Sequence, residues 1–411
     1  MEAVRQAFRL LWAHKVRSAL TLFGLVWGTA AVIFLVGWGA GVKTMVETGF
    51  NKTGKNMGQM WAGRIGEEYT PAVDRRHLWF TWQDVQYARK RTRIATLVAA
   101  EKRWYLPVTA GPKAVKMEIR GVEVESQEIR ALPLAAGRVI TQSDLDHRRR
   151  VTILGADARL DLLGPGGRVG DRIRIDGKSF EVVGFLERVG TQFGRDGEEV
   201  DDQIWIPLST HVAFWPMEWT DDDVISYVLY RMPHRDLADE SEAELRRILA
   251  GRIHVGPTDE EAIVGWSPVK TLRAIPLDQQ DGVMYALSAA TLVIGGIGVL
   301  NMMLDSVRQR RREIGIRLAV GARRRDVLLQ FFLETLTIVG FGGGLGVLLG
   351  VGGCLVLEAL ALPDLIPVPE LSLGVLGMAL GTMGGVGLVS GLVPAWLASR
   401  TDPALTLRAE G

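Results

Sequence analysis

The sequence has a single cysteine, few histidines and no cluster of residues typical of an enzyme or a metal site. Cys354 is the only cysteine, so an intrachain disulfide is impossible. The six histidines are scattered along the chain, at none of the close His/Cys spacings of a zinc site. Neither G-x-S-x-G nor H-E-x-x-H occurs. We therefore predict that the chain carries no catalytic residue and no bound metal.

A large excess of charge of either sign is also lacking, since the formal net charge is +1. A near-neutral chain is not a typical nucleic-acid binder. The carboxylates at 198–202, 221–223 and 259–261 come in runs, which usually form solvated loop surface. We therefore expect neither a nucleic-acid partner nor an acidic active site.

Charge is absent altogether from four long apolar runs, residues 18–42, 282–304, 335–357 and 371–399. Each exceeds the roughly 20 residues that an α-helix needs to cross a bilayer core. Four buried helices of a large soluble protein are the alternative, but such helices rarely stay uncharged for so long. The first run could also be a signal peptide, yet its apolar core is about twice the usual length. We predict four retained transmembrane helices.

Lysine and arginine are missing from the loop at 358–370, and this absence orients the helices. Positive charge near helix ends stays on the cytoplasmic side of the membrane. Four basic residues precede the first helix, eight arginines lie in residues 306–326, and two arginines follow the last helix. We therefore predict a multi-pass protein of the inner (cytoplasmic) membrane, with both termini in the cytoplasm and the 358–370 loop outside.

The predicted fold is thus a membrane protein of four transmembrane α-helices, with a large α+β extracytoplasmic domain inserted between helices one and two. Its parts are an interfacial amphipathic helix at 1–17, transmembrane helices at 18–42, 282–305, 327–357 and 371–399, the extracytoplasmic domain at 43–281, a cytoplasmic loop at 306–326, an extracytoplasmic loop at 358–370 and a cytoplasmic tail at 400–411.

The interfacial helix is predicted from the stripe of Val4, Ala7, Phe8, Leu11 and Trp12, which share one helix face. Such a helix lies in the membrane interface with its aromatic residue as an anchor. A plain cytoplasmic extension of the first transmembrane helix is the alternative, but it would not need this stripe.

The extracytoplasmic domain alternates strand and helix signals. Asp176-Gly177 lies between two alternating apolar segments and predicts a β-hairpin, and Thr81 is a plausible N-cap of a helix. We expect two lobes, with a strand-rich lobe at about 121–214 inserted into the other. The segment GFNKTGKN at 49–56 is close to a phosphate-binding loop, but it ends in Asn56 and follows a membrane helix, so we expect no nucleotide there.

The cytoplasmic loop and the start of the third helix read VRQRRREIGIRLAVGARRRDVLLQFFLE from Val307 to Glu334. This stretch resembles the core signature of the MacB/FtsX superfamily of ABC-transporter permeases. The resemblance extends to the first helix, to residues 132–155 and 169–186 of the outer domain, and to residues 391–408. The matching positions of the signature are Glu313, Ile314, Gly315, Arg317, Gly321, Ala322, Phe332 and Glu334.

The resemblance implies the permease subunit of a MacB-like ABC transporter. Two protomers, as a homodimer or heterodimer, would pair with a cytoplasmic ABC ATPase, and an export assembly would add a periplasmic adaptor protein. ATP and Mg would bind to the ATPase, and this chain would bind no cofactor itself. Only seventeen residues precede the first helix, so we expect the ATPase to be a separate polypeptide. Motion of the ATPase would then be passed through the helices to the outer domain, which is called mechanotransmission.

The order of residues in the loop supports a coupling role beyond its positive charge. Glu313 and Arg317 are spaced i, i+4 in the favourable orientation for a helical pair. Gly315 costs a helix about 1 kcal/mol relative to alanine, which close approach of a partner would explain. The predicted ATPase-coupling residues are Glu313, Ile314, Gly315, Ile316, Arg317, Gly321 and Ala322. Plain topogenic charge is the alternative, but it does not explain Gly315.

Two further features lie inside the predicted membrane helices. Glu334 is an intramembrane ionisable residue and therefore a functional candidate, although an ion pair with a loop arginine is the reading we favour. Glycines at every fourth position predict close helix packing, within one subunit or between two. The predicted packing glycines are Gly24, Gly28, Gly342, Gly346, Gly350, Gly377, Gly381 and Gly385.

The resulting functional hypothesis is export or extraction of a substrate, driven by the partner ATPase. An FtsX-like regulator of extracytoplasmic enzymes would use the same loop, but the large two-lobed outer domain favours the MacB-like exporters. A membrane-anchored enzyme is disfavoured because no catalytic constellation is present. The substrate class does not follow from the sequence.

Overall fold

The computed structural model describes residues 15–52, 54, 56–66, 77–111, 113–194, 199–217, 223–360, 362–363 and 366–400. The chain forms two compact units, Met1–Met45 with Pro276–Gly411, and Val46–Ile275. The stripe predicted for the interfacial helix and the predicted tail beyond Arg400 lie outside the described residues.

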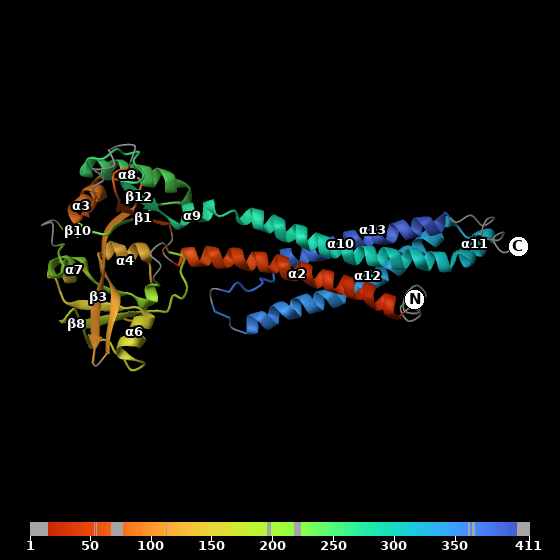
Figure 1. The fold of residues 1–411 in the computed structure, drawn as a ribbon, viewed down its shortest axis with the longest axis horizontal. Helices are drawn as coiled ribbons and strands as arrows, with labels where there is room; N and C mark the ends of the chain where they lie inside the picture. Colours follow the sequence, from red (N-terminus) through yellow and green to blue (C-terminus); the bar gives the residue numbers. More distant parts are fainter. Residues whose placement is uncertain are drawn as a thin grey trace. The chain divides into compact units, whose positions relative to one another are not determined.

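Four helices of the described chain are long and apolar enough to cross a membrane (Figure 1). They are α2 (Lys15–Asn51), α10 (Leu277–Gln309), α12 (Arg324–Ala359) and α13 (Leu373–Ser399), with the short α11 (Arg311–Ala319) between α10 and α12. With the α/β domain between α2 and α10, the predicted fold class is confirmed. The first three helices are longer than the uncharged runs, because the helical backbone continues through polar residues at their ends.

The α+β domain consists of one large sheet, a two-stranded sheet and several helices. Its strands are β1 (Met57–Ala62), β2 (Phe80–Thr81), β3 (Leu97–Ala110), β4 (Lys113–Val122), β5 (Leu134–Gly137), β6 (Val151–Leu154), β7 (Arg172–Ile175), β8 (Lys178–Leu186), β9 (Ile204–Pro207), β10 (Val224–Ile225), β11 (Tyr227–Arg231) and β12 (Ile263–Trp266). Its helices are α3 (Trp82–Arg91), α4 (Val124–Arg130), α5 (Gln142–Asp146), α6 (Ala156–Leu163), η2 (Val200–Asp202), α7 (Leu208–Phe214), η3 (Arg235–Leu237), α8 (Ala238–Ile253) and α9 (Pro268–Ala274).

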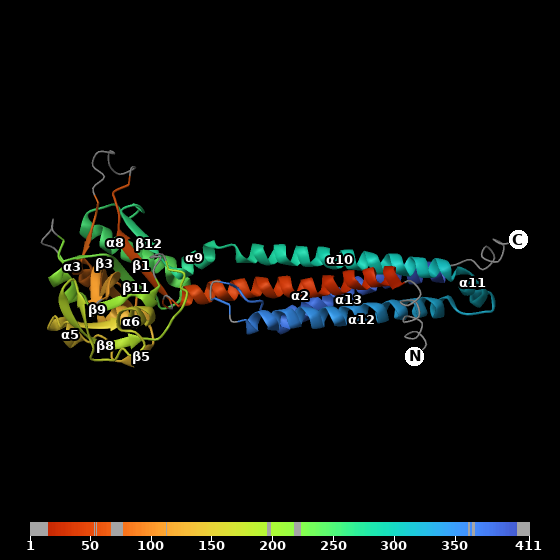
Figure 2. The ribbon, with the colours of Figure 1, turned by 60° about the horizontal axis from the view of Figure 1, so that its bottom comes forward.

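The large sheet runs in the order β12-β1-β11-β3-β4-β9-β6-β8-β5, with β7 paired to β3 and β8. Helix α8 packs against β12 and α3, α3 packs against β3, and α6 packs against β8 and β3 (Figure 2). The long antiparallel β3–β4 hairpin is paired from Glu101–Val122 to Ala110–Lys113. It lies in the middle of the strand order and joins the strands on its two sides into one sheet. The two expected lobes therefore share a single sheet.

The apolar core of the domain is nevertheless divided. One cluster includes Val85, Val98 and Leu245, and another includes Ile119, Phe180 and Ile204. The division does not follow the predicted lobe boundary at 121–214, because Leu208 and Val212 of α7 pack into the first cluster. Helix α7 packs against β4 and β3, so the end of the inserted segment returns to the first core.

Two local predictions in this domain are confirmed. Thr81 caps α3: its hydroxyl accepts from the Asp84 N–H at 3.3 Å, and the Asp84 carboxylate accepts from the Thr81 N–H at 2.9 Å. Asp176 and Gly177 form the tight turn of the β7–β8 hairpin, with φ of 48° and 75°. Positive φ at both central residues is the requirement of a type I′ turn, which Asp-Gly satisfies.

Candidate functional site

The predicted coupling residues lie on α11 and on the turn that follows it. Gly321, with φ of 104°, ends this segment: its N–H donates to the Leu318 carbonyl at 3.2 Å, and the Ala322 N–H donates to the Arg317 carbonyl at 3.0 Å. These two bonds form a Schellman motif, for which glycine in the left-handed region is preferred. The sequence-predicted helix stop at Gly321 is therefore observed, and α12 begins three residues later.

Helix α11 has two unlike faces. Ile314 is 4% exposed and packs with the membrane helices, and Leu318 packs against the same cluster. Ile316 and Val320, one turn apart, are 45% and 84% exposed. The helix thus rests on its own chain through one side and leaves apolar side chains uncovered on the other.

Gly315 is buried in the described chain, as is its neighbour Ile314. Its role in close approach of a partner stays a prediction. The exposed surface of α11 includes Glu313, Ile316, Arg317 and Val320.

Arg317 makes an ion pair within α11 and a hydrogen bond to α12. Arg317 lies 2.5 Å from Glu313 on the same helix, as the i, i+4 spacing predicted. Its other terminal nitrogen donates to the Gln330 side chain at 3.1 Å. Both charged side chains are about half exposed, at 44% and 55%, so they fix the orientation of α11 while staying accessible.

Glu334 also has an arginine partner. Its carboxylate is fully buried in α12 and lies 3.3 Å from Arg310, the residue that separates α10 from α11. This geometry supports the structural reading of Glu334 as one half of an ion pair. The pair holds the end of α10 against the first turns of α12, directly beside α11.

Five of the predicted packing glycines lie at helix crossings. A Cβ added to Gly24 or Gly28 would meet the α10 backbone at 3.5 Å or 3.2 Å. On α12, a Cβ at Gly342 would lie 2.7 Å from the Leu25 side chain, and one at Gly346 would lie 2.7 Å from the Val26 carbonyl. A Cβ at Gly350 would lie 3.2 Å from the Ala30 backbone. Helix α2 therefore packs closely on both α10 and α12.

The glycines predicted on α13 behave differently. A Cβ added to Gly377, Gly381 or Gly385 would have no heavy atom of the described chain within 4 Å, so these glycines make no helix crossing within this chain. The close approaches on α13 are instead at Gly387, beside Val339, and at Gly391, beside Thr335. The two sets lie on different faces of one helix, and only tertiary packing decides which is covered.

The last turn of α2 is held by a loop of the extracytoplasmic domain, a feature that the sequence did not reveal. The Phe193 ring occupies the space that a Gly49 side chain would fill, and the Phe193 N–H donates to the Gly49 carbonyl at 3.2 Å. The Gln192 side chain donates to the Lys52 carbonyl at 2.8 Å. Phe50 packs against Phe193 with ring centroids 5.6 Å apart. All these residues belong to the second compact unit.

A buried carboxylate fixes the base of the same loop. Asp201 is fully buried and accepts hydrogen bonds from the main-chain N–H groups of Val189 and Gly190 at 3.0 and 2.8 Å. Gln192 also accepts from the Val200 N–H at 3.3 Å. Asp201 therefore fixes the start of the 189–193 loop at Val189 and Gly190, and the end of the loop, at Gln192 and Phe193, contacts the last turn of α2.

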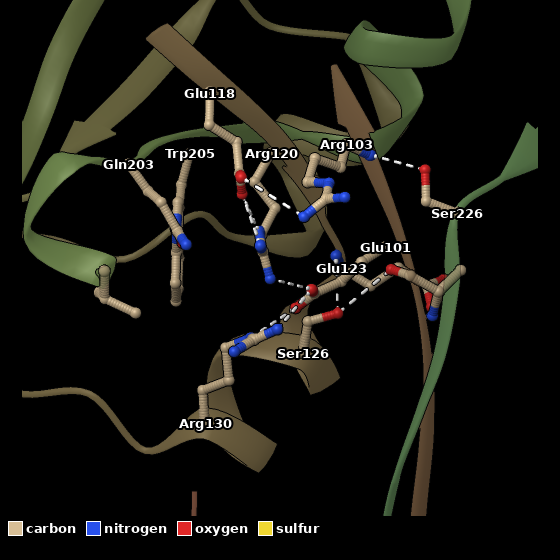
Figure 3. Close-up of polar contacts among 12 residues, drawn as sticks. Glu101, Arg103, Glu118, Arg120, Glu123, Ser126, Arg130, Gln203, Trp205 and Ser226 are labelled. Atoms are coloured by element: carbon tan, nitrogen blue, oxygen red, sulfur yellow. Dashed lines mark hydrogen bonds and ion pairs between the residues drawn. The ribbon is translucent and has the colours of Figure 1, made fainter. Parts of the chain in front are cut away.

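A network of buried charges crosses the β3–β4 hairpin (Figure 3). Arg120 lies 2.5 Å from Glu118 and 3.1 Å from Glu101, and Arg130 of α4 donates to Glu101 at 2.8 Å. All four side chains are at most 6% exposed. Burial without partners would be costly for each charge, so the network favours one arrangement of β3, β4 and α4.

The described residues contain no group of three or more His, Cys, Asp or Glu that could hold a metal ion. The charged groups brought together in the domain are instead paired with one another, as in the network of Figure 3. The paired charges hold segments of the domain against one another.

The whole chain is similar in sequence to known proteins. Residues 18–248 match the MacB-like periplasmic core domain, and residues 285–403 match the FtsX-like permease C-terminal region. The pyoverdine export ATP-binding/permease protein PvdT of Pseudomonas aeruginosa is 31% identical over 423 residues, covering 100% of this chain and 59% of that protein. The macrolide export ATP-binding/permease protein MacB of Bdellovibrio bacteriovorus is 28% identical over 417 residues, covering 100% and 62%.

The chain thus spans about three fifths of the length of these curated relatives. Among solved structures, the periplasmic region of MacB from Actinobacillus actinomycetemcomitans is 15% identical, with a TM-score of 0.42 over 55% of this chain and 95% of that one. The extracellular domain of the ABC-type transporter YknZ from Gram-positive bacteria is 17% identical, with a TM-score of 0.42 over 52% of this chain and 100% of that one.

Proposed function

Since the chain belongs to the family of MacB-like, FtsX-like ABC-transporter permeases, we propose that it couples ATP hydrolysis by a separate cytoplasmic ABC ATPase to movement of its extracytoplasmic domain. The observation that carries this proposal is the two-faced helix α11. A helix that is anchored on one side and exposes apolar and charged side chains on the other is suited to receive force from a second protein.

The exposed face of α11 is the proposed docking surface for the ATPase. Ile316 and Val320 supply apolar contact, and Glu313 and Arg317 supply charges that are already ordered by their own ion pair. Interfaces of this kind combine a small apolar centre with a polar rim. The Arg310–Glu334 pair behind the helix would keep α11 from moving independently of α10 and α12.

Movement would reach the extracytoplasmic domain through the last turn of α2. The loop at 189–193 holds this turn by hydrogen bonds and by the Phe193 ring on Gly49. Because Asp201 anchors the loop to the strand-rich part of the domain, displacement of the turn would be passed into the sheet. This is mechanotransmission without a pore for the substrate.

Export or extraction of a substrate is the proposed outcome. The relatives named above export pyoverdine or macrolides, which supports export as the direction of transport. The alternative, regulation of an extracytoplasmic enzyme, is less favoured because the match to the MacB-like periplasmic core domain covers residues 18–248. A second permease protomer and a periplasmic adaptor are part of the proposal for an export assembly.

The coupling proposal is tested by adding charge to the exposed face of α11. The protein is purified from its own cells, the co-purifying ABC ATPase is identified by mass spectrometry, and ATP hydrolysis of the complex is measured. Ile316→Asp with Val320→Asp should release the ATPase or abolish its stimulation. Leu160→Asp with Val169→Asp, at residues of the outer domain that are each 44% exposed, is the matched control and should change neither. Equal behaviour of the two double variants would refute the docking surface.

The proposed orientation is tested by cysteine labelling in a Cys354→Ser background. Glu240→Cys on α8 should react with an impermeant maleimide in intact spheroplasts, whereas Arg311→Cys on α11 should react only after the membrane is opened. Both residues are exposed in the structure, so burial does not limit the reaction. Labelling of Arg311→Cys from outside would overturn the cytoplasmic placement of the coupling segment.

A further inference from the structure

The outer part of α2 is contacted by residues 366–370, a segment without regular secondary structure that precedes α13. The Glu370 N–H donates to the Gly37 carbonyl at 2.8 Å, and the Thr44 hydroxyl donates to the Glu370 carboxylate at 2.8 Å. Pro369, the preceding residue, is buried. All these residues belong to the first compact unit. The segment therefore follows α2 over about two helical turns, from Gly37 to Thr44.

Two glycines of α2 make room for this segment. A Cβ added to Gly41 would lie 2.9 Å from the Val368 carbonyl carbon and closer still to its oxygen. A Cβ added to Gly37 would lie 3.2 Å from the Glu370 carbonyl oxygen and 3.5 Å from the Pro369 side chain. The atoms that a Cβ at Gly41 would meet belong to the main chain, so they cannot rotate away as a flexible side chain can. The close approach of the two backbones therefore requires glycine at position 41.

The same segment leads directly into α13. Ser372 is the N-cap of α13, and its hydroxyl accepts from the Val375 N–H at 3.2 Å. Because this cap lies only two residues after Glu370, little slack remains between the contact on α2 and the start of α13. The glycine contacts described above also tie α2 to α12, at Gly346 among others. Helix α2 is thus held by α12 along the middle of its length and by the 366–370 segment farther out.

We propose that the 366–370 segment joins the outer part of α2 to α13, so that the two helices move as one unit when the ATPase acts. This role rests on the proposed function, in which displacement reaches the extracytoplasmic domain through the last turn of α2. Coupling between distant sites is carried by rigid elements that are packed together. A helix that slips or bends against its neighbours loses part of the displacement, and the contacts at Gly41 and Glu370 prevent this slip. Gly41 and Glu370 are therefore positioning residues.

Amide hydrogen exchange of the complex with its co-purifying ABC ATPase, in lipid nanodiscs, tests this role. In the unmodified complex, ATP should change the exchange of residues 46–51 at the end of α2. Gly41→Ala displaces the 366–370 segment and should remove most of this change while ATP hydrolysis continues. Gly39→Ala is the matched control and should keep the change, because the nearest atom to its Cβ is in the Met284 side chain at 3.4 Å, an ordinary contact. A contact that serves only stability would lower the melting temperature of Gly41→Ala and leave its response to ATP intact.

A covalent link between the two helices gives a second test that does not depend on the folding of Gly41→Ala. Thr44→Cys and Glu370→Cys are joined by a bifunctional thiol reagent in a Cys354→Ser background. Because α2 and α13 move as one unit, the linked complex should keep the ATP-dependent change at residues 46–51. Loss of the change on linking would show that the segment must release α2 during the cycle, and it would overturn the proposal.

The outcomes separate this role from the proposed function. A full response to ATP in Gly41→Ala would refute only the tie between α2 and α13. The absence of an ATP-dependent change at residues 46–51 in the unmodified complex would refute the transmission of movement through α2, and the role of the 366–370 segment with it.

Discussion

Glutamate–arginine pairs occur in both units of the protein, and they differ in their exposure to solvent. In the extracytoplasmic domain, the fully buried Glu101 accepts from Arg130 at 2.8 Å and from Arg120 at 3.1 Å. On α11, the Glu313–Arg317 pair is shorter, at 2.5 Å, but both side chains are about half exposed. Breaking a buried pair leaves an uncompensated charge, whereas an exposed pair contributes little to stability. The buried pairs therefore stabilise the fold of the domain, whereas the exposed pair on α11 remains accessible to a partner.

The largest difference in stability between the two kinds of pair is expected when the carboxylate charge is removed from each. Glu101→Gln leaves two buried arginines without their shared partner and should lower the stability by about 3–5 kcal/mol. Glu313→Gln should lower it by less than about 1 kcal/mol, because water replaces the lost contact. Thermal unfolding of the two purified variants measures the difference. Similar shifts in melting temperature would show that the network of Figure 3 does not hold the domain.

The next largest change in stability is expected from substitutions at the packing glycines of α12 and α13. Gly346→Leu forces a side chain against the Val26 carbonyl and Thr29, where a Cβ alone would lie within 2.7 Å, and should destabilise the helices by about 1–3 kcal/mol or more. Gly381→Leu meets nothing in the described chain within 4 Å, so the melting temperature of the monomer should not change.

Size-exclusion chromatography with light scattering then measures the oligomeric state of the Gly381→Leu variant. Loss of a dimer with unchanged monomer stability would mean that this face of α13 packs against a second protomer. An unchanged oligomeric state would mean that the face contacts lipid. A fall in monomer stability as large as that of Gly346→Leu would contradict the observed packing.

A smaller effect is expected at Lys102, a buried cation whose ammonium donates to the Trp215 carbonyl at 2.9 Å. Burial lowers the pKa of Lys102 from 10.5 to about 8. Between these values the unfolded chain keeps a proton that the folded domain has released, so the stability should rise with pH across this window. Lys102→Met should raise the stability at pH 7 and remove the rise between pH 8 and 10.5.

Melting temperatures measured from about pH 7 to pH 10.5 test this expectation. Lys116→Met, at an exposed lysine on the neighbouring strand β4, is the control and should keep the rise seen in the unmodified protein. If Lys102→Met were less stable at pH 7, the hydrogen bond to Trp215 would outweigh the cost of burying the charge.

The elements that were predictable from the sequence depend on local signals. The four long helices follow from uncharged runs, the α3 cap from Thr81, the β7–β8 turn from Asp176-Gly177, and the helix stop after α11 from Gly321. In each case the residues that determine the structure are neighbours in the chain, so no knowledge of the tertiary fold is required.

The features that were not predictable depend on which distant segments meet. Gly346 and Gly381 have the same spacing in the sequence, yet only Gly346 lies at a crossing, because the rotation of each helix is set by its neighbours. The burial of Gly315 likewise depends on tertiary packing and could not be predicted from its place in the sequence. The Phe193–Gly49 contact joins a loop to a helix, and the Glu101–Arg130 pair joins a strand to a helix. Both pairs are far apart in sequence, and no periodic pattern marks them.

The most direct test of the coupling claim is site-specific photo-crosslinking from the two faces of α11. A photoreactive amino acid is placed at Ile316, which is 45% exposed, or at Ile314, which is 4% exposed, in cells that contain the ABC ATPase. The account predicts a crosslink to the ATPase from position 316 and none from position 314, which should crosslink only within its own chain. Absence of an ATPase crosslink from position 316, in a protein that is inserted and folded, would contradict the claim that this face of α11 receives the ATPase.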